Sequence, residues 1–300
     1  MIRTTILILL VVSLNSNGQE IALTFDDAPT ADGPLFSGDE RTQRIVHTLK
    51  KHGVTEAAFF VLTGNIRETT QARLKTYSEA GHILANHSHK HLWMHQVGTK
   101  AYINDLRTAD SILSNIPGYM KWYRYPYLDE GRTVAARDSV RIALRDLNLS
   151  NGYVTVDNYD WYLNSLLKKA KEGNRKINMK ALRDVYVQHI HSSIRFYDDV
   201  ATRHLGRAPK HVLLLHENDL AALFLDDLIE YLKSNGWKII SPRQAYEDPI
   251  SRHVPDVLFN GQGRVAAIAR EKGVPARELV QFSEDEEYLE QLVSSLNVFE

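Results

Sequence analysis

The chain has 300 residues, of which 43% are hydrophobic and 24% charged, with 36 basic against 37 acidic side chains. A chain of this size can bury a substantial core in one large domain or two ordinary ones, which excludes a small disulfide scaffold. The formal net charge of −1, without a long block of like charge, offers no surface for a phosphate backbone, so we expect no nucleic-acid partner. Because cysteine is absent, any metal must be held by histidine and carboxylate.

The start of the chain differs in kind from the rest. Residues 6–12 are all apolar, a single basic residue precedes them, and the small residues Ser16 and Gly18 stand where a signal peptidase cleaves. This pattern predicts a secretory signal peptide over residues 1–18, a mature chain that begins at Gln19, and export to the periplasm or the extracellular space. The apolar run is far shorter than the ~20 residues that span a bilayer, so we expect no integral membrane anchor. A buried first strand is the alternative interpretation of the run.

After this segment, short apolar runs alternate with longer segments of helical period, and we find no internal repeat. The alternation is typical of an α/β protein with a mostly parallel sheet. The predicted strands are residues 21–25, 57–62, 82–85, 122–124, 152–156, 212–215 and 237–240. The predicted helices between most of them are residues 41–51, 70–80, 101–114, 134–147 and 220–234. About seven β/α units can close into a barrel or form an open doubly wound sheet, and periodicity does not decide between the two.

Polar side chains gather at the C-terminal ends of these strands, where β/α barrels build active sites. Asp26 and Asp27 directly follow the first strand, and their side chains point in different directions, so one can bind a metal while the other faces the substrate. An acidic turn held by local hydrogen bonds is the alternative. His87 and His91 follow the third strand and are four residues apart, a spacing that places two imidazoles on one face of a helical turn. A histidine-rich surface loop is the alternative here, and we expect His89 to point elsewhere.

Three further segments each close a short strand, namely residues 124–127, 157–161 and 213–216. Each alone has structural interpretations at least as common as functional ones. Together with the two earlier segments, however, they resemble the five motifs of the polysaccharide deacetylase family in sequence order. This family comprises the NodB-homology domains of carbohydrate esterase family four, and the resemblance covers about residues 20–249. It implies a distorted (β/α) barrel that removes acetyl groups from a carbohydrate in a metal-dependent reaction.

The resemblance also implies a role for each motif residue. Asp27, His87 and His91 would hold one divalent metal, most simply Zn²⁺, although Co²⁺, Ni²⁺ or Mn²⁺ would suit the same donors. Asp26 would be the catalytic base, and His216 would be the acid that protonates the leaving amine.

The other motif residues would support these groups or contact the substrate. Arg124 would orient and charge-balance Asp26 and keep it ionised, while Asp160 would hold His216 in its protonated form. The expected substrate contacts are the backbone N–H of Tyr127 at the developing oxyanion, and Trp161 and Leu214 around the acetyl group.

The chain departs from the family pattern at two internal positions. Ala28 stands where the family usually has glycine, a change that removes no catalytic group. About residues 162–210 form an insertion that is longer than the family pattern and predicted to be helical near 179–203. We expect its His189 and His191 to pack or lie at the surface rather than bind metal.

Residues 250–300 form a C-terminal extension that matches no part of the family pattern. Helical period near 265–272 and 285–296 predicts two helices in it. The extension can pack on the barrel or contact a partner.

The main hypothesis is an exported, metal-dependent N-deacetylase whose partner is an acetylated glycan containing N-acetylglucosamine, of the peptidoglycan or chitin type. O-deacetylation of acetylated xylan would use the same residues. A non-catalytic glycan-binding relative would keep the fold, and loss of Asp26 or His216 would have favoured it, but both are present.

Overall fold

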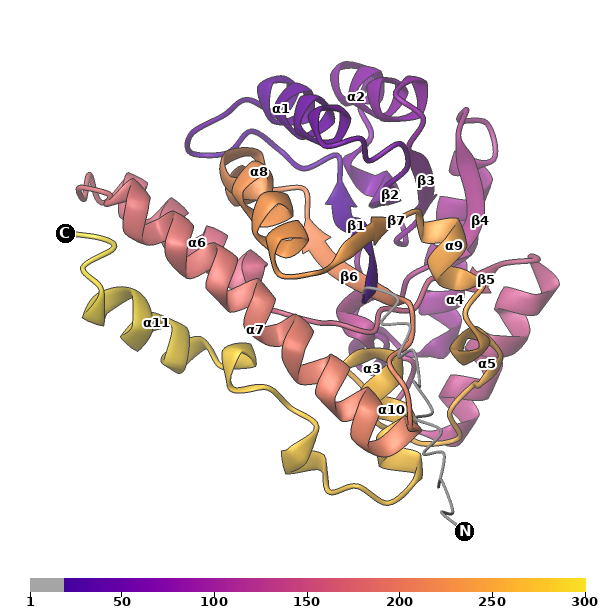
Figure 1. The fold of residues 1–300 in the computed structure, drawn as a ribbon. Coiled ribbons are helices and arrows are strands. Elements are labelled where there is room, and N and C mark those ends of the chain that lie inside the picture. The colour runs from indigo at the N-terminus through magenta and orange to yellow at the C-terminus, as the bar shows by residue number, and fades with distance from the viewer. Residues whose placement is uncertain (1–18) are drawn as a thin grey trace, which may run out of the picture.

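The computed structural model describes residues 19–300, and its centre is a seven-stranded parallel sheet (Figure 1). The strands are β1 (Glu20–Ala28), β2 (Ala58–Val61), β3 (Ile83–Asn86), β4 (Tyr119–Tyr123), β5 (Ser150–Asn151), β6 (His211–His216) and β7 (Lys238–Ile240). The α-helices are α1 (Gly38–Lys51), α2 (Glu68–Glu79), α3 (Met94–Val97), α4 (Thr99–Leu113), α5 (Val134–Asp146), α6 (Asp160–Glu172), α7 (Met179–Leu205), α8 (Asp219–Ser234), α9 (Pro242–Tyr246), α10 (Gly263–Glu271) and α11 (Glu286–Ser295). Short 3₁₀ helices cover Thr63–Asn65, Pro126–Leu128, Pro249–Arg252, Ala276–Glu278 and Phe282–Glu284.

β1 pairs with three other strands of this sheet, whose strand order is β5-β4-β3-β2-β1-β6, with β7 also paired to β1. One edge of β1 pairs with β6 from Ile21 to Asp26. The other edge pairs first with β7 and then, from Thr24 onward, with β2. The strand is therefore covered on both edges, and its continuous apolar run from Ile21 to Leu23 is fully buried, as expected of a parallel strand with helices on its faces.

The sheet curls into a distorted barrel, as the sequence predicts. Val156 forms an isolated parallel bridge with Leu213 of β6, and the backbone N–H of Leu214 donates to the carbonyl of Val156. The segment after β5 therefore reaches back to the far edge of the sheet. The expectation of a distorted (β/α) barrel of about seven strands is confirmed by this curled parallel sheet and its surrounding helices.

The predicted strand over residues 152–156 is wrong, because β5 lies just before it, at Ser150–Asn151, and Val156 forms only an isolated bridge. The N–H of Gly152 still donates to Tyr123 of β4, whereas the N–H of Thr155 donates to Val212 of β6. The segment crosses from one strand to another and cannot form a continuous ladder with either.

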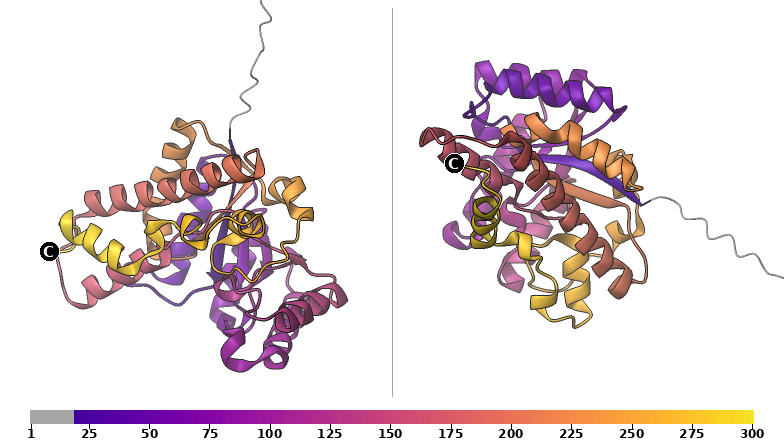
Figure 2. Two further views of the ribbon diagram at one scale, coloured as in Figure 1. Left: turned by 90° about the horizontal axis from the view of Figure 1, so that it is seen from below. Right: turned by 60° about the vertical axis from the view of Figure 1, so that its left-hand side comes forward.

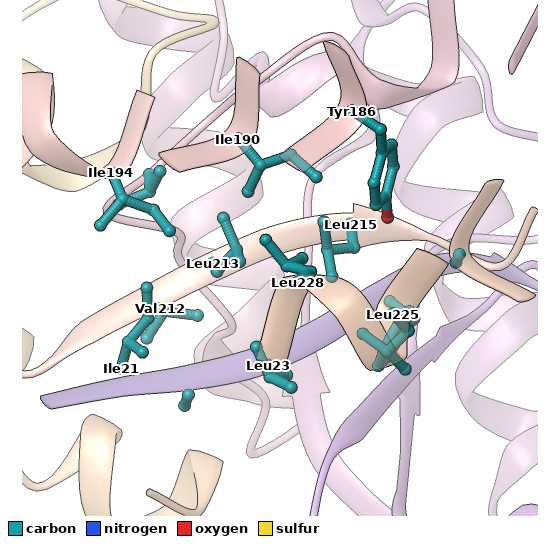
Figure 3. Close-up of a cluster of buried hydrophobic side chains, with 14 of the residues drawn as sticks. Ile21, Leu23, Tyr186, Ile190, Ile194, Val212, Leu213, Leu215, Leu225 and Leu228 are labelled. Atoms are coloured by element: carbon teal, nitrogen blue, oxygen red, sulfur yellow. The ribbon is translucent and has the colours of Figure 1, made fainter. Parts of the chain in front are cut away.

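α7, which lies within the predicted insertion, covers the barrel beside β6. Tyr186, Ile190 and Ile194 are four residues apart, so they share one face of the helix, and all three are fully buried. They point from α7 toward β6, where they meet Leu213 and Leu215 (Figure 3). The insertion therefore contributes to the main hydrophobic core.

The C-terminal extension runs along the insertion (Figure 2). α10 packs against α7, and α11 packs against α6. The last residues return to the loop between α6 and α7, where Ile177 and Phe299 form an antiparallel bridge. The insertion and the extension thus form one layer on the barrel.

Within residues 19–300, no helix is long and apolar enough to cross a membrane. The predicted signal peptide, residues 1–18, lies outside the described residues.

The packing of α7 predicts a difference between two isoleucines. Ile194→Ala should lower the free energy of unfolding by about 2–5 kcal/mol, because it removes buried methyl groups and leaves a cavity. The matched change Ile142→Ala, on a side chain that is 49% exposed, should change it by less than about 0.5 kcal/mol. Urea unfolding curves measure both, and an equal effect would contradict the docking of α7 on the barrel.

Candidate active site

The parallel strands bring the predicted site residues to one end of the barrel. Asp26 at the end of β1 pairs in register with His216 at the end of β6. Asn86 at the end of β3 pairs with Tyr123, and the N–H of Arg124 donates to the Asn86 carbonyl. The residues that follow β1, β3, β4 and β6 therefore face a common region, although they are far apart in the sequence.

Asp27, His87 and His91 direct their ligand atoms at one another. Asp27 Oδ1 lies 3.6 Å from His87 Nε2 and 3.7 Å from His91 Nε2, and the three ligand atoms lie within 4.8 Å of one another. Asp27 Oδ1 is buried and has no hydrogen-bond partner. A buried carboxylate oxygen without a partner, facing two imidazole nitrogens, is expected where a cation completes the cluster. The residues therefore fit a divalent metal, and their nitrogen and oxygen donors suit Zn²⁺ and similar ions.

The two histidines reach the cluster from an irregular loop and not from the predicted helical turn. Ser88 and His91 have φ angles of 77° and 52°. The loop is held by local hydrogen bonds, from the Ser88 N–H to Asn86 Oδ1 and from the His91 N–H to Ser88 Oγ. Spacing of four residues thus brings the imidazoles together through turn geometry.

His87 is oriented by a backbone carbonyl. Its Nδ1 lies 3.0 Å from the carbonyl oxygen of Arg124. Since a carbonyl only accepts, Nδ1 carries the hydrogen, and the Nε2 lone pair faces Asp27. Burial lowers the pKa of His87 to about 3, so the ring is neutral and suited to bind a metal.

Asp26 and Arg124 form a buried ion pair beside the cluster. Arg124 Nη1 donates to Asp26 Oδ1 at 2.6 Å, while Asp26 Oδ2 lies 3.7 Å from His87 Nε2. The guanidinium is fixed by further bonds to Thr24 Oγ1 and the Gly152 carbonyl, both at 2.8 Å. Burial raises the pKa of Asp26, and Arg124 offsets only part of this effect. Arg124 therefore acts in the expected direction, but burial outweighs it.

His216 and Asp160 form a second pair. His216 Nδ1 lies 2.6 Å from Asp160 Oδ1, and the backbone N–H of His216 donates to Asp160 Oδ2 at 3.0 Å. Asn218 Nδ2 donates to the same Oδ2 at 3.1 Å. Burial disfavours the charged ring, but the Asp160 carboxylate outweighs it and raises the pKa of His216 to about 10. The imidazolium therefore persists at neutral pH.

The three predicted substrate contacts differ in their surroundings. Tyr127 is 47% exposed and has a φ of 58°. Its ring stacks on that of Trp93 with centroids 4.6 Å apart, and its centroid lies 4.5 Å from that of the His91 ring. Leu214 is buried and lies two residues before His216, so the two side chains share one face of β6. Trp161 is 39% exposed, and its ring contacts are with neighbouring tyrosines of the same segment.

The other histidines singled out in the sequence lie outside the cluster. His89 Nδ1 bonds Thr63 Oγ1 at 2.9 Å. His189 is buried and accepts from the Tyr159 N–H at 3.3 Å, and His191 packs edge-on against Tyr231.

Sequence reasoning missed Glu217, which directly follows His216 and is fully buried. Its Oε2 accepts from the Thr30 N–H at 2.7 Å, and its own N–H donates to the Asp26 carbonyl at 3.1 Å. Glu217 therefore ties the turn after β1 to the end of β6. Its Oε1 accepts from buried partners on α2, namely Arg73 Nη2 at 2.5 Å and Tyr77 Oη at 2.9 Å.

Only a weak signal could have revealed this network. Arg41, Ile45 and Leu49 recur every four residues on α1, and Arg73 and Tyr77 do so on α2. An arginine on an otherwise buried helix face indicates an interior acidic partner, but it does not say which one.

Comparison with known proteins finds similarity to one family over part of the chain. The family model for polysaccharide deacetylase matches residues 13–145. Two peptidoglycan-N-acetylglucosamine deacetylases of Bacillus cereus match, one 34% identical over 112 residues and 37% of each chain, the other 26% identical over 158 residues and 51% of each chain. The matches thus span between 37% and 51% of the length of these curated relatives. The resemblance to the polysaccharide deacetylase family that the five motifs predict is confirmed.

Solved structures share the fold. A CE4 family pseudoenzyme from Bacillus anthracis is 21% identical with a TM-score of 0.52, and the match covers 76% of this chain and 66% of that one. A peptidoglycan deacetylase from Bacillus subtilis is 23% identical with a TM-score of 0.50, and the match covers 77% of this chain and 91% of that one.

The cluster geometry predicts how metal content responds to mutation. Asp27→Ala, His87→Ala and His91→Ala should each leave less than one equivalent of bound Zn²⁺ after loading and dialysis, because only two donors remain. Asp26→Asn should retain most of the metal, since Asp26 bonds Arg124. His47→Ala, at an exposed histidine, is the control. Metal analysis measures the zinc content of each variant, and full occupancy in His87→Ala would contradict the assignment of His87 as a ligand.

The His216–Asp160 pair predicts a shifted titration. NMR should find His216 protonated well above neutral pH, and Asp160→Asn should lower the pKa of His216, because the carboxylate that most strongly opposes burial is removed while Asp26 and Asp27 remain. The raised pKa also implies that protonation of His216 stabilises the fold fully below about pH 6.5, and that this stabilisation is lost as the pH rises to about 10. An unchanged titration in Asp160→Asn would contradict the pairing.

Proposed function

We propose that the chain is a metal-dependent hydrolase that removes acetyl groups from N-acetylglucosamine units of a glycan, of the peptidoglycan or chitin type. The names of the Bacillus cereus relatives support this class of substrate. The observation that carries the proposal is the convergence, at one barrel end, of a three-residue metal cluster, a buried carboxylate–arginine pair and a charged histidine: Asp27, His87 and His91, then Asp26 with Arg124, then His216 with Asp160.

Hydrolysis of an amide needs an activated water, a stabilised oxyanion and a protonated leaving nitrogen. Asp27, His87 and His91 would hold a divalent metal, which would supply polarisation of the acetyl carbonyl and a more acidic water. Asp26 lies beside this cluster and accepts the proton from the water through Oδ2, while Arg124 holds its other oxygen. We assign to the backbone N–H of Tyr127 the hydrogen bond that stabilises the developing oxyanion.

His216 completes the reaction by giving a proton to the nitrogen. The bond from the water oxygen to the acetyl carbon forms, the carbon–nitrogen bond breaks, and acetate and a free amine leave. The pKa of about 10 keeps His216 charged at neutral pH, and Asp160 holds the ring through Nδ1. An amine needs this proton in order to leave more than an alcohol does, so the charged histidine favours N-deacetylation over removal of O-acetyl groups from xylan.

We further propose that the protein acts after export, in the periplasm or outside the cell. The apolar run at residues 6–12 and the small residues before Gln19 support this location.

Acetate release from chitin oligomers, peptidoglycan and acetylxylan tests the proposed function. The metal-loaded protein should release acetate from at least one N-acetylated substrate, and a chelator should abolish the release. Asp26→Asn should lower the rate by about 10²–10⁴-fold with metal content unchanged, because it removes the base. Asp39→Asn, at an exposed carboxylate, is the matched control. No release from any substrate would support the non-catalytic alternative, and release from acetylxylan alone would support the O-deacetylase.

The pH profile of the same reaction tests the acid. Activity should rise with pH as Asp26 loses its proton and fall as His216 loses its own. Asp160→Asn should move the alkaline limb to lower pH, since the pKa of His216 falls when the carboxylate is removed. If the alkaline limb stays in place, another group donates the proton.

A further inference from the structure

A cavity outside the proposed active site lies between the barrel and the C-terminal extension. It consists of two adjoining hollows of about 40 and 460 Å³. The barrel side comes from the residues after β4 and β5 and from α5, and the extension contributes the start of α10. The side chains that line both hollows are Tyr125, Glu130, Arg141, Asn151, Tyr153 and Arg264.

Unsatisfied polar atoms converge on this cavity. Across residues 19–300, seven buried side-chain atoms have no hydrogen-bond partner, and three of them lie in this wall: Tyr125 Oη, Tyr153 Oη and Arg141 Nε. Tyr125 is 3% exposed and Tyr153 is 6% exposed. Buried polar groups are rarely left unpaired, so a concentration of them around one cavity indicates an occupant that bonds to them.

The acidic group in the wall is already neutralised. Glu130 Oε2 accepts from Arg141 Nη2 at 3.0 Å, and Glu130 Oε1 accepts from Asn151 Nδ2 at 2.8 Å. Arg124 also lines the smaller hollow, and its charge is matched by Asp26. The charges of Glu130 and Arg141 therefore balance each other, as do those of Asp26 and Arg124.

Arg264 is the buried charge that remains, since Arg145, which lines the larger hollow, is exposed to solvent. It is 3% exposed, and among the described residues no carboxylate oxygen lies within 4.0 Å of its guanidinium. Its Nη1 donates only to backbone carbonyls, those of His253 at 2.8 Å and Ile250 at 3.4 Å, and the guanidinium lies 4.4 Å from the centroid of the Tyr153 ring. Glu130 acts on Arg264 only from a distance, because its carboxylate bonds Arg141 and Asn151. A buried guanidinium without an acidic group in direct contact favours an anion nearby.

We propose that this cavity binds a small oxyanion, a carboxylate or a phosphate, which accepts hydrogen bonds from Tyr125, Tyr153 and Arg141 Nε and is attracted by the charge of Arg264. The unpaired groups are two hydroxyls and an arginine N–H, all of which can donate, so an occupant that offers only acceptors and carries negative charge satisfies them together. The smaller hollow exceeds the roughly 10–15 Å³ that one water needs, which leaves room for a larger occupant. The C-terminal extension then has a function, because it supplies the positive charge of the site.

Acetate and inorganic phosphate are the probes that test this site. The protein is kept free of metal, so that neither anion can bind through an ion at Asp27, and ionic strength is held constant with sodium chloride. Thermal unfolding and titration calorimetry should detect saturable binding of at least one probe. Binding of acetate alone identifies a carboxylate site, binding of phosphate alone identifies a phosphate site, and binding of both identifies a general oxyanion site.

Variants locate the binding. Tyr153→Phe removes only an unpaired hydroxyl, so it should fold normally and bind the anion about tenfold more weakly. Arg264→Gln should weaken binding further, and Arg252→Gln, at an exposed arginine of the same extension, should leave it unchanged. If neither anion binds better than chloride, or if Tyr153→Phe and Arg264→Gln bind as the unmodified protein does, the cavity holds water and the proposal fails.

Discussion

The parallel pairing of β1 with β6 is the constraint on which the rest of the site depends. It places Asp26 beside His216, and so the proposed base beside the proposed acid. A slip of β1 by one residue would turn Asp26 to the opposite face of the sheet from His216. Glu217 opposes such a slip, because its backbone holds the Asp26 carbonyl and its carboxylate holds the Thr30 N–H beyond the turn.

Burial makes each ionisable group of the site depend on a fixed partner. Arg124 balances the charge of Asp26, yet burial still raises the pKa of Asp26. The pKa of His216 rises because the interaction with Asp160 raises it by more than burial lowers it. Burial therefore decides the direction of the pKa shift for Asp26, whereas the charged partner decides it for His216. The raised pKa of Asp26 makes it a stronger base, and the raised pKa of His216 keeps it protonated at neutral pH. Both properties suit a base and an acid that act in one reaction.

The sequence predicts the helices and strand ends that depend on residues close together in the chain. The helix expected at residues 134–147 is α5, Val134–Asp146, and the polar residues after each apolar run lie at one end of the barrel because parallel strands end together. The segment 152–156 was mistaken for a strand because its crossing from β4 to β6 depends on distant partners. For the same reason local patterns do not identify Glu217 as the centre of its network, and they do not predict the bridge between Ile177 and Phe299.

The central place of β1 also bears on how the chain folds. β1 is the first strand along the chain, but two of its partners, β6 and β7, come from residues 211–240. Closing so long a loop lowers the chain entropy before the strand pairing stabilises the structure. Folds dominated by non-local pairing therefore form slowly. Until β6 docks, Leu23 and Phe25 lie on a strand with an open edge, the kind of surface through which folding intermediates aggregate. The strand that positions the proposed base in the folded protein therefore keeps an unpaired edge until residues 211–240 are in place.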